Sequence, residues 1–139
     1  MLEYINQIRT NLGIPINPKE KEKGIKGNKG FYWGFPDGFN ELSENTKVYY
    51  EIEYGQNHPN TNVLKYWPIL EENEALSIIL IQWIIKKPKS KNRWELSKFI
   101  GDKMEKTFPK RFTYCFLEYE EESNIKKLNS IRIQIQSIK

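Results

Sequence analysis

Apolar residues recur at helical spacing in two segments, one at the start of the chain and one at residues 93–108. The first such stripe ends at Gly13, a residue type that stops helices, and consists of Leu2, Ile5, Ile8 and Leu12. A second, longer stripe predicts a helix from Arg93 to about Phe108. We expect the buried face of that helix to carry Leu96, Phe99, Ile100, Met104 and Phe108.

Runs of aromatic and β-branched residues predict five strands. They cover residues 31–35, 47–54, 76–85, 111–119 and 131–136. The run at 76–85 is almost continuously apolar, which is typical of a central strand covered on both faces. We expect residues 31–35 to pair with 47–54, because sequential strands are often neighbours. With the helices between them, these strands predict a single α/β domain over 1–139, with a mixed sheet flanked by helices.

One segment of this domain has few residues to bury. Residues 17–30 are rich in lysine and glycine, and we expect them to form a mobile basic loop. Such a loop either connects the first helix to the sheet or closes on a phosphate backbone.

The strand at 47–54 carries the first candidate chemistry. Side chains alternate faces along a strand, so Glu51 and Glu53 lie on one face, roughly 7 Å apart along the backbone. Asp37 follows Pro36 in a turn between the two predicted strands and can approach this pair. Three acids in one place repel each other, so one is protonated or a divalent cation is bound. The alternative is that both glutamates form the solvated face of an edge strand.

These acids resemble the motif of the PD-(D/E)XK nucleases, in which Pro-Asp is followed by an acid-x-lysine strand. Pro36-Asp37 matches the first half, and Glu51 matches the first acid of the second. Glu53 stands where the family usually has lysine. A minority of restriction enzymes likewise have glutamate at this position. The segment Asn62 to Tyr66 is similar to the Gln-x-x-x-Tyr helix motif of RecB-like nucleases. The resemblance covers roughly residues 31–85 and implies a restriction-endonuclease-like core.

A nuclease of this kind implies Mg²⁺ or Mn²⁺ held by carboxylates, with a water activated for attack on phosphate. We expect Asp37 and Glu51 to bind the metal. Glu53 then acts as the base for the water or binds a second metal. Alternatively, Lys65 supplies the positive charge missing from position 53, from a different place on the backbone.

Basic and aromatic residues beyond this motif predict a surface for DNA, since phosphates attract clustered lysine and arginine. The chain has a formal net charge of +4. The predicted nucleic-acid contacts are Asn62, Tyr66, Lys86, Lys87, Lys89, Lys91, Arg93 and Lys98. Tyr66 has core packing as its alternative role, and the basic residues have a solvated helix face as theirs.

The composition excludes several classes of site. A lone Cys115 and a lone His58 leave no disulfide framework and no multi-histidine metal centre within one chain. The chain has no phosphate-binding glycine loop, no signal-peptide pattern and no apolar run long enough to span a membrane. We therefore expect a cytoplasmic protein that acts on DNA, as a homodimer or as a subunit of a larger complex. The alternative function is a non-catalytic nucleic-acid-binding or protein-interaction domain on the same fold.

Overall fold

The protein is described by a computed structural model, which covers residues 1–16, 24–55, 58–86 and 92–138. Its centre is a four-stranded sheet in the order β3-β4-β5-β6. The strands are β3 (Gly38–Glu41), β4 (Thr46–Glu53), β5 (Ser77–Ile84) and β6 (Phe112–Glu118). β3 runs antiparallel to β4, whereas β4, β5 and β6 are parallel to one another. The molecule is thus a mixed α/β fold with helices on both faces of the sheet.

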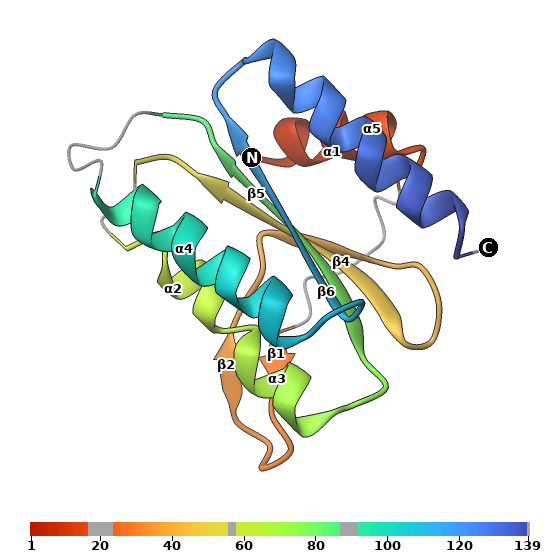
Figure 1. Cartoon of the computed structure of the whole chain (residues 1–139), viewed down its shortest axis with the longest axis vertical. Helices are drawn as coiled ribbons and strands as arrows, with labels where there is room; N and C mark the ends of the chain where they lie inside the picture. Colours follow the sequence, from red (N-terminus) through yellow and green to blue (C-terminus); the bar gives the residue numbers. More distant parts are fainter. Residues whose placement is uncertain (17–23, 56–57, 87–91, 139) are drawn as a thin grey trace.

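Two groups of helices cover the two faces (Figure 1). One face packs against α1 (Leu2–Leu12) and α5 (Glu122–Gln136), which also contact each other. The other face is covered by α2 (Thr61–Leu64), α3 (Trp67–Glu72) and α4 (Asn92–Thr107). Each face has its own apolar core, so β4 and β5 are buried on both sides.

The predicted first helix and the predicted strands at 47–54, 76–85 and 111–119 are confirmed as α1, β4, β5 and β6. Gly13 ends α1 with a left-handed φ of 71°, a conformation that suits glycine. Residues 65 and 66 separate α2 from α3. Pro68 lies in the first turn of α3, where proline is tolerated.

The predicted strand at 131–136 is wrong, because these residues belong to α5. The alternation of isoleucine with polar residues suggested a strand. The buried residues of α5, however, include Leu128, Ile131 and Ile135, which are spaced by three and four as on a helix. Ile133 is 68 % exposed on its outer side.

The predicted pairing of residues 31–35 with β4 is also wrong. β2 (Tyr32–Gly34) instead pairs with β1 (Ile25–Lys26) in a separate two-stranded sheet. The antiparallel neighbour of β4 is β3, which follows the predicted turn at Asp37. On its other edge β4 pairs with β5. Of the predicted basic loop at 17–30, residues 17–23 lie outside the described part of the chain, and Ile25 is a buried strand residue rather than a loop residue.

The predicted helix at 93–108 is confirmed as α4, but its buried face is only partly the expected one. Met104 and Phe108 are buried as predicted. Leu96 and Phe99 are exposed, whereas Trp94, Ser97, Gly101 and Met104 are buried. Gly101 lets the helix approach β6 closely, because a Cβ there would lie only 2.3 Å from the ring of Tyr114. The small residues Ser97 and Gly101 therefore lie on the face of α4 that contacts the sheet. A prediction based on large apolar residues alone overlooks them.

The helical register of α5 gives a test of the fold. Ile131→Ala should lower the free energy of unfolding by about 2–5 kcal/mol, because it empties a buried site. Ile133→Ala should change it by less than about 0.5 kcal/mol, because that side chain is in solvent. Urea unfolding of the two variants measures the difference, and similar losses in both would indicate the strand that the alternation suggested.

Candidate functional site

The two glutamates of β4 lie on the face of the sheet that α2 covers. Glu51 and Glu53 share this face with Tyr49, whose ring packs in the same core as Val63 of α2. Both glutamates are only 1 % exposed. The alternative of a solvated acidic face on an edge strand is therefore wrong: β4 is an inner strand, and both carboxylates are inside the protein.

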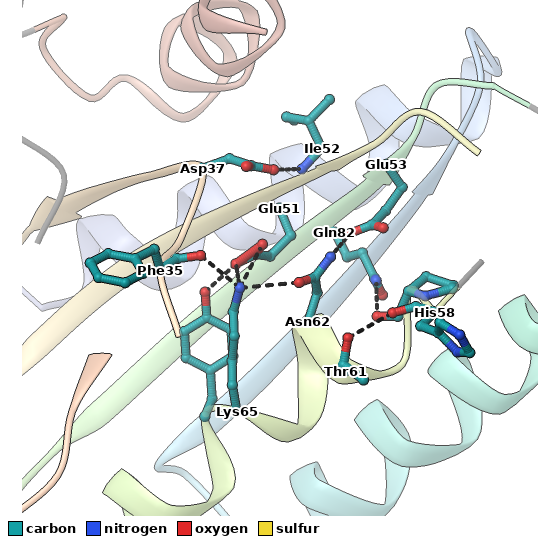
Figure 2. A network of polar contacts seen from close by, with 12 residues as sticks. Phe35, Asp37, Glu51, Ile52, Glu53, His58, Thr61, Asn62, Lys65 and Gln82 are labelled. Atoms are coloured by element: carbon teal, nitrogen blue, oxygen red, sulfur yellow. Dashed lines mark hydrogen bonds and ion pairs between the residues drawn. The ribbon is translucent and has the colours of Figure 1, made fainter. Parts of the chain in front are cut away.

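Glu51 is held by two side chains from the segment that follows α2. The ammonium Nζ of Lys65 lies 2.9 Å from Oε2 of Glu51 and 3.0 Å from Oε1. The hydroxyl of Tyr66 donates a hydrogen bond of 2.5 Å to Oε2. Lys65 also donates to the carbonyl of Phe35 and to Oδ1 of Asn62, so it joins three parts of the chain at one point (Figure 2).

Glu53 has a different environment, built from amides. Nδ2 of Asn62 donates a hydrogen bond of 2.6 Å to Oε1 of Glu53. The second oxygen, Oε2, is buried and has no hydrogen-bond partner among the described residues. A buried carboxylate oxygen without a donor is costly, and a proton on that atom or a bound cation would relieve the cost.

Asp37 approaches the glutamates from the edge of the sheet. β3 begins at Gly38, opposite Tyr50, so the last residues of β4 have no strand beside them on that edge. Asp37 replaces the missing strand: its amide donates to the carbonyl of Tyr50, and its Oδ2 accepts from the amide of Ile52 at 2.7 Å. This contact places the third acid one residue from Glu51 and Glu53 along the ladder (Figure 2).

Burial dominates the electrostatics of all three acids. It raises the pKa of Glu51 to about 8, and Asp37 adds to the rise, although Lys65 and Tyr66 favour the ionised form. Burial likewise raises the pKa of Glu53, although the nearby amide side chains of Asn62 and Gln82 favour its ionised form. The pKa of Asp37 is raised by burial too, against the Ile52 amide and Lys65. Perturbed acids gathered in this way are typical of functional sites.

The charge of Asp37 acts on both glutamates, but each of the three acids is bound to groups of the protein. Asp37 contacts the Ile52 amide, Glu51 contacts Lys65 and Tyr66, and Glu53 contacts Asn62. Across residues 1–16, 24–55, 58–86 and 92–138, no three acidic, histidine or cysteine side chains are arranged as a ready metal site. The expected role of Mg²⁺ or Mn²⁺ at these acids stays a prediction.

The structure brings the helix part of the motif to the acids, as expected from the sequence. Asn62 and Lys65 both reach the acidic cluster, and Tyr66 is fully buried with its hydroxyl on Glu51. Tyr66 therefore positions Glu51, and in this arrangement it has no surface for a phosphate.

The predicted basic surface is only partly described. Lys86 and Arg93 are exposed, and Arg93 lies against Nδ1 of His58 at 2.5 Å. Lys98 is bound at 2.6 Å to Glu118 and lies over the ring of Phe116, so its charge is already partnered. Lys87, Lys89 and Lys91 lie outside the described residues.

Sequence reasoning missed two polar residues of the site. Gln82 is fully buried in β5, directly opposite Glu51 in the ladder, and donates to the carbonyl of Pro59. The hydroxyl of Tyr114 donates to Oε1 of Gln82 at 2.6 Å. A lone amide inside an otherwise apolar strand was the available signal, because a buried polar group needs partners.

Comparison of the chain with models of protein families, with curated proteins and with solved structures finds no match. The resemblance to PD-(D/E)XK nucleases therefore remains an expectation from a few short motifs. Among the described residues, no helix is both long enough and apolar enough to cross a membrane.

The raised pKa of Glu51 predicts how stability depends on pH. The folded protein holds a proton on this carboxyl up to about pH 8, whereas the unfolded chain loses it near its ordinary value. The folded state thus binds more protons between these values, so the free energy of unfolding should fall as pH rises from about 5 to 8. In Glu51→Gln this fall should be smaller.

Urea unfolding at a series of pH values measures this effect. Glu44→Gln, at an exposed position after β3, is the matched control and should retain the wild-type dependence. Parallel profiles for wild type and Glu51→Gln would show that the Glu51 carboxyl is ionised in the folded protein throughout this range.

Proposed function

We propose that the protein is a divalent-metal-dependent nuclease of the PD-(D/E)XK kind, which hydrolyses phosphodiester bonds in DNA. The observation that carries this proposal is the contact of Lys65 with Glu51 beside Asp37. It brings a lysine ammonium to the acids although position 53 is a glutamate. A lysine from the segment after α2 thereby restores the combination of two acids and a cation that the motif implies.

The donor set fits a hard divalent cation, which prefers carboxylate oxygens. Glu53 offers a buried oxygen without a partner, and Asp37 uses Oδ2 alone in its hydrogen bond to Ile52. Asp37, Glu51 and Glu53 would hold the ion. When bound, Mg²⁺ or Mn²⁺ supplies charge neutralisation at a phosphate and a nucleophilic water at neutral pH.

Lys65 is the residue that would act most directly on the substrate. Its ammonium has two acceptors besides Glu51, the carbonyl of Phe35 and Oδ1 of Asn62. It can therefore leave Glu51 to a metal and stay beside the acids, where its charge stabilises a phosphate that gains negative charge in the transition state. Burial raises the pKa of Glu53 above its ordinary value, which would suit this carboxylate as the base for the water.

The position of the cluster in the sheet also supports a site. Glu51 and Glu53 are near the carboxyl end of β4, and β5 and β6 run parallel to it. In open α/β sheets ligands bind at the carboxyl ends of the strands. A core of the restriction-endonuclease kind, a cytoplasmic location and DNA as partner are parts of this same proposal.

A second candidate is a non-catalytic nucleic-acid-binding or protein-interaction domain. It is favoured by the internal pairing of Glu51, which Lys65 and Tyr66 neutralise without any ion. In that case the acids stabilise the contact between α2 and the sheet, and nucleic acid is bound elsewhere.

Cleavage assays with Mg²⁺ or Mn²⁺ test the proposal. Lys65→Met should lower the rate of DNA cleavage by about 10²- to 10³-fold, because it removes the cation at the reacting phosphate. Glu51→Gln should abolish cleavage at any metal concentration that supports the wild type.

The matched control is Lys126→Met, an exposed lysine on α5 at the opposite face of the sheet. It should cleave as the wild type does. Absence of metal-dependent cleavage in a folded wild-type protein, or cleavage that survives in Glu51→Gln, would contradict the nuclease proposal and favour the binding domain.

A further inference from the structure

A hairpin of exposed aromatic residues lies beside the acidic cluster. We call residues 24–35, with β1 and β2, the aromatic hairpin. Four of its rings are strongly exposed: Phe31 at 47 %, Tyr32 at 53 %, Trp33 at 41 % and Phe35 at 60 %. Single apolar residues on a surface need no explanation, but four large rings within five positions form a patch that indicates a binding surface.

The rings are arranged in two pairs rather than scattered. Tyr32 and Phe35 are stacked, with centroids 5.3 Å apart and planes 23° apart. Phe31 and Trp33 form an edge-to-face pair at 4.7 Å. Each pair holds its rings in place while leaving them accessible to a planar partner.

The charge of the aromatic hairpin fits a polyanion. Its sequence contains Lys26 and Lys29, both exposed, and no acidic residue. The nearby Glu72 of α3 is already engaged, since its Oε2 accepts a hydrogen bond from the amide of Asn28. Aromatic rings with adjacent lysines bind single-stranded nucleic acid, because bases stack on the rings while phosphates meet the cations.

The hairpin is also continuous with the acidic cluster. The carbonyl of Phe35 accepts the hydrogen bond of Lys65 Nζ at 2.8 Å, and Asp37 follows two residues later. The stem of Lys65 passes so close to Gly34 that a Cβ there would lie 2.9 Å from its Cδ. A strand whose bases stack on these rings would bring its phosphates past Lys65.

From these contacts we infer that the aromatic hairpin binds unpaired bases, so that the substrate is single-stranded DNA or a single-stranded end of a duplex. This inference rests on the proposed function, because it names the form of substrate for the same site. Binding to the hairpin does not itself require the metal, so it can be measured separately from cleavage.

The experiment measures binding of an oligothymidine of about 15 nucleotides and of a duplex of the same length, in EDTA. The single strand should bind at least about tenfold more tightly than the duplex. Phe35→Ala and Tyr32→Ala should each weaken single-strand binding about tenfold, through the loss of a stacked base. Circular dichroism confirms that these exposed substitutions leave the fold intact.

Tryptophan fluorescence gives a second readout. Trp83 and Trp94 are buried, whereas Trp33 is exposed, so stacking on the hairpin should quench the Trp33 emission. Trp33→Phe should lose most of this quenching and retain binding, because a phenyl ring still stacks. Retained quenching in Trp33→Phe would show that the strand lies elsewhere.

Two controls separate the outcomes. Ile133→Ala, on the far side of the sheet, should bind as the wild type does. Loss of binding in Phe99→Ala, with the hairpin variants unchanged, would place the strand along α4 and overturn the inference. A duplex preference also overturns it, and so does the absence of any oligonucleotide binding, which would favour a protein partner for these rings.

The inference and the nuclease proposal can fail independently. Single-strand binding by the hairpin without metal-dependent cleavage would support the inference and contradict the nuclease. Cleavage of single strands with wild-type efficiency by Phe35→Ala and Tyr32→Ala would do the reverse.

Discussion

The structure depends most on the placement of acidic side chains inside an α/β core. Removing a carboxylate from water is expensive, and a buried ion pair often repays no more than that cost. Glu51 is nevertheless buried on an inner strand and receives contacts from Lys65 and Tyr66, while Glu53 keeps an unpartnered oxygen. An apolar residue at either position would avoid this cost, and for this reason we assign the two acids a role in the proposed function.

The sheet creates this placement because β3 does not extend along the last residues of β4. β3 begins opposite Tyr50, so the end of β4 has an open edge that Asp37 occupies through the Ile52 amide. On the face of the sheet, the break between α2 and α3 directs Lys65 and Tyr66 toward Glu51. The cluster thus forms where the end of a strand, a break between two helices and a turn meet. None of these three features shows as a periodic pattern in the sequence.

The sequence was sufficient to predict the parts of the fold that have a clear period. The stripe that ends at Gly13 and the apolar run of β5 were predicted correctly, because the apolar pattern of each segment identifies it by itself. Residues 131–136 were predicted incorrectly as a strand. Their isoleucines fit the period of a strand and that of a helix until the packing partner is known. The pairing of β2 failed for a similar reason, since a short aromatic run does not specify which strand it joins.

The candidate site shows the same division. The side chains of Glu51 and Glu53 were correctly placed on one face, since strand alternation requires it, and Asn62 and Lys65 were correctly expected near them. The burial of Tyr66 was predicted only as the alternative to a nucleic-acid contact, and the role of Gln82 was not predicted. Each depends on contacts between segments far apart in the chain. Residues 31–35 were predicted to be a strand paired with residues 47–54, and the exposure of their rings was not predicted.

The central claim is that Asp37, Glu51 and Glu53 together hold a divalent cation, with Lys65 beside it. A crystal structure of the protein soaked in Mn²⁺, with anomalous data, tests this most directly. We predict an anomalous peak between these carboxylates, with Lys65 Nζ still bound to the carbonyl of Phe35. A crystal soaked in saturating Mn²⁺ that shows no anomalous peak there, and in which Lys65 Nζ still contacts both carboxylate oxygens of Glu51, would contradict this claim.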